Sequence, residues 1–343
     1  MATLPSKQYW RAREENARKK AIQDDYTRSL EIKGIYQQLT AEIEKDISAF
    51  YQKYADKNGL TYAEVQKRVA QVDIDAYSKK AEYYVKNRKK KGIAFSKTAN
   101  QEMELYNLTM KVNRLEMLKA QIGLEMVERF SDLEDYMQGE LDGVALEEYQ
   151  RQAGILGDTL NNNPQAAEAL PNASYKQPGF IVSDVDEPFY HATFSNRIWT
   201  HYGELKASLD GLLARALVNG EGSGKLISDL RKATGASEFN ARRLIITETA
   251  RVRTEVQKQA MEDAGVIYYE FMALGPNPCE ECQNNDGKVY SVKDMEPGFN
   301  APPMHPFCHC STGAASNPNY NAWLEHLANG GTTEEFYNED LYD

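Results

Sequence analysis

Apolar residues recur at three- and four-residue steps through much of the first 150 positions, which is the spacing of an amphipathic helix. One such stripe is formed by Ile32, Tyr36, Leu39, Ile43, Ile47, Phe50 and Tyr54. A second is formed by Leu108, Val112, Leu115, Ile122, Met126 and Phe130. Because such stripes usually form the seams of helical hairpins or bundles, residues 1–150 are predicted to be an arm of long helices. Breaks between helices are expected at Asn58-Gly59, Gly92, Gly139 and Gly143.

Helical spacing is lost after this arm and returns later in the chain. Residues 151–193 contain Asn161-Asn162-Asn163-Pro164 and further prolines, which predict a linker or extended crossing. Residues 194–265 show an apolar stripe again and are predicted to form a helical domain. Within it, Gly235 is expected to separate two helices, and Gly265 is well suited to end the last one.

After Gly265 the hydrophobic period shortens toward two, the period of a β-strand. The segments 266–272 and 288–292 are therefore predicted to be strands of a small module formed by residues 266–315. Residues 316–343 contain no Lys or Arg and are predicted to be an acidic tail. The predicted fold class is mainly α: a long helical N-terminal arm and an α-helical domain that ends in a small α+β, zinc-knuckle-like module.

The composition of the chain excludes several classes of protein. The 343 residues are 41% hydrophobic and 10% aromatic, which is too apolar for a chain that is disordered throughout. No apolar run approaches the roughly 18–20 residues of a membrane-spanning helix, so no membrane span is expected. The net charge of −11 argues against coating DNA through charge alone. The basic run Lys86–Lys91 is either a solvated helix face or a weak contact with nucleic acid or an acidic partner.

All four cysteines of the chain fall in one window near its C-terminal end. Cys279 and Cys282 form a Cys-x2-Cys pair, in which a tight turn can point both sulfurs at one ion. His305 and Cys308 repeat this spacing, and Cys310 is a further candidate. Tetrahedral zinc takes four nitrogen or sulfur ligands, so four of these five residues are predicted to bind a structural Zn²⁺. The preferred set is Cys279, Cys282, His305 and Cys308, and Cys310 can replace either member of the second pair.

Two other interpretations of this window stay open. The thiols could pair as disulfides, but residues 1–10 lack the segments of a secretory signal, so we expect a reducing compartment. They could also be free buried thiols or redox-active thiols. A catalytic zinc is disfavoured, because five candidate ligands leave no obvious open position. His309, between two cysteines, is expected to point away from the ion.

The rest of the sequence shows no recognisable catalytic motif, so we expect no enzymatic activity. The segment Gly220–Lys225 resembles a phosphate-binding loop, but Asn219 stands where its first glycine is required. Leu226 stands where Ser or Thr would bind Mg²⁺. Three histidines have no nucleophile nearby in a recognisable arrangement: His191, His201 and His326.

The order of these motifs resembles the phage head-morphogenesis family, the Mu F-like minor head proteins of tailed bacteriophages. The resemblance covers roughly Phe194–Thr312. It is carried by Phe194–Trp199, Arg243–Glu248, the Cys279 and Cys282 pair, Asp286–Tyr290 and Pro303–Cys310. The N-terminal Gln8-Tyr9-Trp10-x2-Arg13 is similar to members from phages of Gram-positive hosts. This chain departs from the family at His309, where the family usually has Arg.

The resemblance implies a minor capsid protein that lies inside the head near the portal, and in the host cytoplasm during assembly. It implies the portal protein as a partner, with scaffolding and major capsid proteins as further candidates. The implied role is in procapsid assembly, with DNA packaging or ejection as further steps. Two alternatives are a DNA-delivered metal-dependent enzyme or effector, and an accessory protein that binds double-stranded DNA through Lys86–Lys91.

Overall fold

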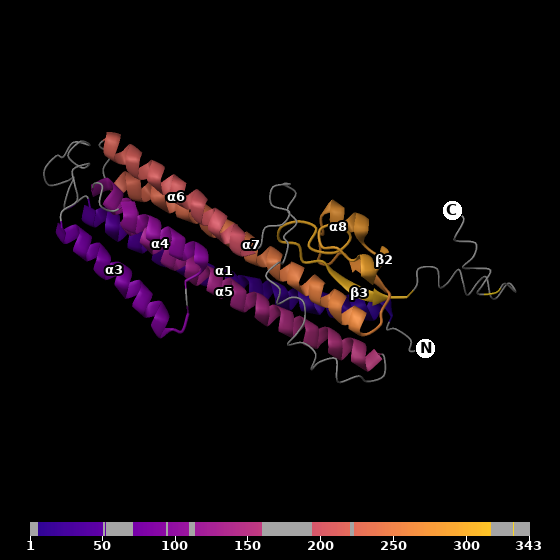
Figure 1. Cartoon of the computed structure of the whole chain (residues 1–343). Coiled ribbons are helices and arrows are strands. Elements are labelled where there is room, and N and C mark those ends of the chain that lie inside the picture. Colours follow the sequence, from indigo (N-terminus) through magenta and orange to yellow (C-terminus); the bar gives the residue numbers. More distant parts are fainter. Residues whose placement is uncertain are drawn as a thin grey trace. The chain divides into compact units, whose positions relative to one another are not determined.

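Long helices make up most of the described part of the chain (Figure 1). The structure is a computed structural model and describes residues 6–50, 52, 71–93, 95–109, 114–159, 194–219, 223–316 and 332. The helices are α1 (Lys7–Phe50), α3 (Gln71–Lys90), α4 (Lys97–Thr109), α5 (Arg114–Thr159), α6 (Phe194–Asn219), α7 (Ser223–Asp263) and α8 (Glu280–Asn285). None of these described helices is long and apolar enough to cross a lipid bilayer. The predicted mainly α class is confirmed.

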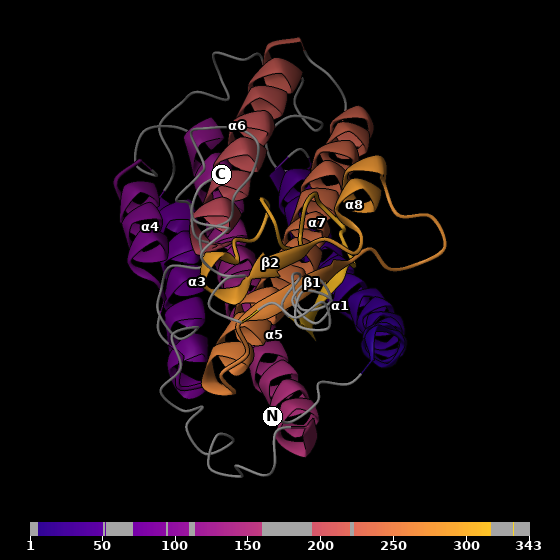
Figure 2. The ribbon, with the colours of Figure 1, turned by 90° about the vertical axis from the view of Figure 1, so that its right-hand side faces the viewer.

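A small antiparallel sheet follows α7, and Figure 2 shows its strands β1 and β2 side by side. The strands are β1 (Tyr268–Met272), β2 (Val289–Ser291) and β3 (Ser311–Ala315), in the spatial order β2-β1-β3. The first two confirm the predicted strands, whereas β3 was not predicted. Tyr269 of β1 lies opposite Tyr290 on one side and Ala314 on the other. Because β3 consists of small residues, its strand conformation depends on pairing with β1.

The chain divides into two compact units, each assembled from separate stretches of sequence. The first unit collects Met1–Asp25, Leu141–His191 and Ile246–Asp343, and the second collects Tyr26–Glu140 and Ala192–Ile245. Helices α1, α5 and α7 each contribute residues to both units. The five segments expected from the sequence, 1–150, 151–193, 194–265, 266–315 and 316–343, stay a prediction.

The core of the second unit is built from the apolar stripes seen in the sequence. Ile32 and Ile43 of α1 are fully buried. On the same stripe, the ring of Tyr36 packs edge-on against Phe130 of α5, with 5.9 Å between ring centroids. Phe130 packs in the same way against Tyr202 of α6 at 5.5 Å. The helical periodicity therefore marks faces that are buried against other helices.

Three glycines that were expected to break helices lie inside them, so those three predictions were wrong. Helix α5 continues through Gly139 and Gly143, and α7 is unbroken through Gly235. A glycine in a helix interior costs only about 1 kcal/mol relative to alanine. Burial of nearby side chains such as Leu141 and Leu230 is large enough to offset that cost.

Two other glycines end helices as predicted. Gly92 follows α3 and has a φ of 72°. Gly265 has a φ of 71°, and its N–H donates to the carbonyl of Glu262 at 3.0 Å. The N–H of Val266 donates to the carbonyl of Met261 at 2.8 Å. These two bonds form a Schellman cap, which ends α7 and directs the chain into β1.

Some predictions fall on residues outside the described part of the chain. They are the break at Asn58-Gly59, residues 160–193 of the predicted linker, and most of the acidic tail. Residues 151–159 of that linker are described and continue helix α5, so the linker was predicted to start too early. The phosphate-loop-like segment is described from Ser223 onward, where it forms the start of α7.

Candidate metal centre

The first pair of candidate ligands lies on the short helix between β1 and β2. Cys279 is the N-cap of α8, and its Sγ accepts a hydrogen bond from the N–H of Cys282 at 3.4 Å. The turn after the helix uses Gly287, whose φ is 78°. Asp286 Oδ1 accepts the N–H of Ala273 at 2.9 Å and ties the two sides of the loop together. The backbone of this loop therefore fixes the separation of the two sulfurs.

The second pair lies in the loop that leads into β3. A turn brings the N–H of Cys308 to the carbonyl of His305 at 3.1 Å, with Phe307 at a positive φ of 62°. The Nδ1–H of His305 donates to the carbonyl of Pro306, 2.8 Å away. In the neutral ring this bond places the proton on Nδ1 and leaves a lone pair on Nε2, which lies 3.5 Å from Cys282 Sγ. This is the form of the ring that can bind a metal ion.

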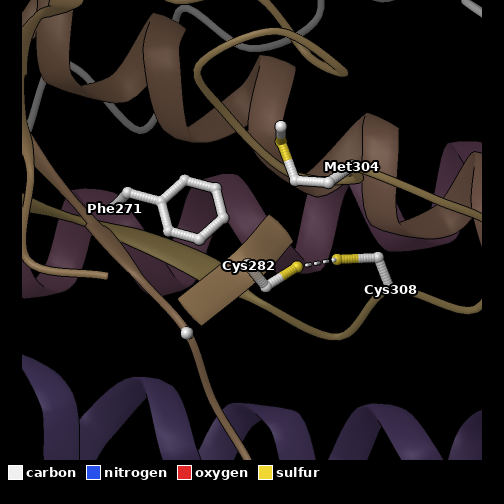
Figure 3. Close-up of a cluster of buried hydrophobic side chains, with 5 residues drawn as sticks. Phe271, Cys282, Met304 and Cys308 are labelled. Carbon is white, nitrogen blue, oxygen red and sulfur yellow. Dashed lines mark hydrogen bonds between the residues drawn. The ribbon is translucent and has the colours of Figure 1, made fainter. Parts of the chain in front are cut away.

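Cys282 is the residue at which the two pairs meet (Figure 3). Its Sγ lies 3.5 Å from His305 Nε2 and 3.9 Å from Cys308 Sγ. The ligand atoms of Cys279, Cys282 and His305 lie within 4.8 Å of one another, as do those of Cys282, Cys308 and Cys310. The structure thus brings all five predicted residues together, in two groups that can hold a metal ion.

The cluster is set in the hydrophobic core of the module. Figure 3 shows the thiols of Cys282 and Cys308 directed at one another, near Phe271 of β1 and Met304. Cys310 packs against this core and is less deeply buried. Apolar surroundings limit the access of water to the sulfurs of Cys282 and Cys308, whereas Cys279 is exposed.

Cys310 and His309 are placed differently from the other candidates. Within the described residues, Cys310 shares a metal-sized group with Cys282 and Cys308 but not with His305. His309 Nδ1 lies 3.7 Å from a carboxylate oxygen of Asp25 on α1. The histidine between the two cysteines therefore faces α1 instead of the cluster.

Cys282, Cys308 and Cys310 share hydrogen bonds that shift the pKa values of their thiols in opposite directions. Hydrogen bonds from Cys282 and Cys310 hold the pKa of Cys308 well below its usual value. The bond with Cys308 raises the pKa of Cys282, and a bond with Cys308 also raises the pKa of His305 to about 9. Several thiolates can lie this close together only when a cation neutralises them.

The first turns of α1 belong to the same compact unit and pack on the sheet that carries the cluster. Trp10 is buried against Gly313 of β3, where an added Cβ would come within 3.3 Å of the Trp10 Cβ. Lys7 Nζ pairs with a carboxylate oxygen of Glu270 on β1 at 2.8 Å. The absence of a side chain at Gly313 therefore leaves room for Trp10 and also for Met272 of β1, whose Cε would lie only 2.5 Å from an added Cβ.

A buried polar network joins α1, α5, α7 and β3 beside the cluster. Arg151 donates to Glu14 at 2.8 and 2.9 Å, and to Glu148 at 2.6 and 2.9 Å. Glu14 also accepts the hydroxyl of Ser311 at 2.7 Å, and Gln257 donates to Glu148 at 2.8 Å. A cavity of about 30 Å³ lies among these residues, enough for one or two waters. No local pattern marks them in the sequence, because partners such as Glu14 and Ser311 are 297 positions apart.

In the second unit, the residues of the basic run Lys86–Lys91 differ in burial. Arg88 is buried, and its guanidinium pairs with Asp132 at 3.3 Å and with Asp135 at 2.5 Å. In contrast, Lys86 and Lys89–Lys91 are exposed. Arg88 therefore stabilises the packing of α3 on α5, and the lysines form the part of the run that faces solvent.

Residues 208–313 match the model of a family described as Phage Mu protein F like protein. The matched segment contains all five candidate ligands and the strands β1 and β2. The match confirms the resemblance found in the order of the sequence motifs and supports a role in the phage head. No curated protein and no solved structure matches the chain.

Proposed function

We propose that this chain is a minor capsid protein of a tailed double-stranded DNA bacteriophage, associated with the portal protein inside the head. In this role it assists procapsid assembly in the host cytoplasm and takes part in DNA packaging or ejection from the virion. Scaffolding or major capsid proteins are further partners in the proposal. The family match over residues 208–313 is the observation that carries it.

Within this proposal, Cys279, Cys282, His305 and Cys308 bind one structural Zn²⁺. Zinc–sulfur bonds of about 2.3 Å and zinc–nitrogen bonds of about 2.0 Å make tetrahedron edges of about 3.8 Å between two sulfurs and about 3.5 Å between sulfur and nitrogen. The Cys282–Cys308 and Cys282–His305 distances, 3.9 and 3.5 Å, are close to these edges. The donor set fits zinc, which would join the α8 loop to the loop before β3.

The same ligand set favours a structural ion over a catalytic one. A catalytic zinc keeps one position for water or substrate, whereas four protein ligands close the coordination sphere. We therefore propose no enzymatic activity. The alternative, a metal-dependent enzyme or effector, predicts turnover that disappears in Cys279→Ser while the fold survives.

Coexpression with the neighbouring portal protein tests the proposed role. The wild-type chain is expected to co-purify with portal assemblies and to be present in procapsids in few copies, as measured by pull-down and quantitative mass spectrometry. Procapsids assembled without the portal protein serve as the control and are expected to lack the chain. Portal-containing procapsids that also lack the chain would contradict the proposal.

A weak contact with packaged double-stranded DNA is also proposed, through the exposed residues Lys89–Lys91. Replacing all three lysines with glutamine is expected to weaken binding and to reduce the slope of log K against log salt by about 2.7, since each phosphate contact contributes about 0.9. Fluorescence anisotropy with duplex DNA across a salt series measures this slope. Lys33→Gln, at an exposed lysine of α1, is the control. An unchanged slope in the triple variant would remove this contact from the proposal.

A further inference from the structure

The loop between β2 and β3 carries the most exposed large apolar side chain among the described residues. Phe299 is 75% exposed, and Ile267, which precedes β1, is next at 66%. The N–H of Val292, where this loop begins, donates to the carbonyl of Ile267 at 2.8 Å. The two most exposed apolar side chains therefore come from segments that a backbone hydrogen bond joins.

Phe299 stands on a turn that is organised by the buried side chain of the next residue, Asn300. The Asn300 Oδ1 accepts the hydroxyl of Tyr269 at 2.9 Å and the N–H of Glu296 at 2.8 Å. The Asn300 Nδ2 donates to the carbonyl of Asp294 at 2.7 Å. Three hydrogen bonds from one side chain thus attach the turn to β1 and to its own backbone.

The backbone of the turn is held at its other positions as well. The N–H groups of residues 299–301 all point to the carbonyl of Glu296, each at 3.2 Å. The N–H of Gly298 donates to the carbonyl of Ala301 at 2.9 Å, and Gly298 has a φ of 86° that favours glycine. The turn is therefore a rigid base for a phenylalanine that its own fold does not bury.

This combination is typical of an aromatic anchor in a protein–protein interface. A single exposed apolar residue is common on protein surfaces and by itself indicates little. Here the backbone is already ordered, so binding would immobilise few additional degrees of freedom. Residues that dominate interface affinity are often large rings that insert into a pocket of the partner.

The charges around Phe299 indicate what kind of partner would fit. Asp294 and Glu296 are exposed on the same turn, and neither forms an ion pair within the part of the chain that the structure describes. Lys258 Nζ donates to the carbonyl of Met295 at 3.1 Å, and Lys293 is exposed just before the turn. The exposed ionised side chains of residues 293–301 are thus two carboxylates and one ammonium. Two unpaired carboxylates beside an apolar anchor favour a protein surface with basic side chains. The same carboxylates disfavour stacking of Phe299 on DNA, because the phosphates would be repelled.

We propose that the 294–301 turn is a docking site for another protein of the phage head, which receives Phe299 in an apolar pocket bordered by basic side chains. The inference rests on the proposed function, in which that partner is the portal protein. It adds the surface through which this chain makes the contact.

A binding measurement between the full-length chain and the portal protein of the same phage tests the docking site. Phe299→Ser is expected to weaken binding about 30-fold, the effect of losing an interface hot spot. Its melting temperature and zinc content are expected to equal those of the wild type, because Phe299 is largely exposed. Phe239→Ser is the matched control, since Phe239 is also exposed, at 53%, but lies on α7. Asp294→Lys combined with Glu296→Lys is expected to weaken binding and to change its salt dependence.

Each outcome separates the docking site from the wider role. Wild-type affinity in Phe299→Ser overturns the docking site and leaves the proposed function standing. Equal losses in Phe299→Ser and Phe239→Ser also overturn it, because the effect would not be specific to the turn. A third outcome is that Phe299→Ser abolishes self-association of the chain and leaves portal binding unchanged. The turn would then bind a second copy of this chain, and the portal would be overturned as its partner. No portal binding by the wild-type chain would overturn both the docking site and the proposed function.

Discussion

Replacing Cys282 with serine is expected to abolish zinc binding and to unfold the module that contains β1, α8, β2 and β3. Cys282 is fully buried and is shared by both groups of candidate ligands. A structural zinc contributes on the order of 10 kcal/mol of metal-coupled folding free energy, and the module has a small core with which to replace it. Elemental analysis should find one zinc per wild-type chain and none in Cys282→Ser, and limited proteolysis should cleave the module in the variant.

Cys310→Ser is the matched control, because it makes the same chemical change close to the cluster. It is expected to keep one zinc and the wild-type melting temperature, since Cys310 is not among the four proposed ligands and is less deeply buried than Cys282 and Cys308. Cys308→Ser is expected to lose the ion. If Cys310→Ser loses zinc while Cys308→Ser retains it, the fourth ligand is Cys310. Zinc retained in Cys282→Ser would refute the site.

Replacing Trp10 with alanine is expected to lower the free energy of unfolding of the first unit by about 3–5 kcal/mol, the usual cost of truncating a large buried aromatic. Trp10 is 1% exposed and packs on β3 at Gly313. Arg11 lies one turn of α1 after Lys7, which pairs with Glu270. Arg11 forms an ion pair with Asp286, in the loop that follows α8. Because this helix supports the sheet that carries the cluster, the variant should also release zinc at lower chelator concentration.

Chemical denaturation followed by circular dichroism measures the change in stability, and titration with a chelator measures zinc retention. The control is Tyr9→Ala, an aromatic on the neighbouring position that is 40% exposed. Its effect on the free energy of unfolding should stay below about 1 kcal/mol. Equal effects of the two substitutions would show that α1 does not depend on the Trp10 contact with β3.

The helices could be predicted because their signal is local. The stripe that contains Ile32 and Ile43 repeats with the period of a helix, and those residues are buried as expected. The helix breaks predicted at Gly139, Gly143 and Gly235 were wrong because a non-local effect decides those positions. A glycine weakens a helix by a small local free energy, and burial against distant parts of the chain exceeds it.

The candidate metal centre was partly visible for the same reason. The x2 spacing of Cys279 with Cys282, and of His305 with Cys308, is written in the sequence, and it marked the residues that the structure brings together. The sequence could not show that Cys282 of the first pair contacts both His305 and Cys308 of the second pair. It depends on how the loop after β1 and the loop before β3 are placed by the sheet.

The sequence by itself determined the helical class, the position of the two first strands and the five residues of the cysteine and histidine window, because each is encoded by neighbours a few positions apart. Only the tertiary structure decided that β3 pairs with β1, that Trp10 packs on that strand, and that Glu14 and Arg151 form a buried network beside the cluster. These contacts join residues that are far apart in the chain. Their free energy comes from burial and pairing, which depend on the partner that the fold supplies and not on the local sequence pattern.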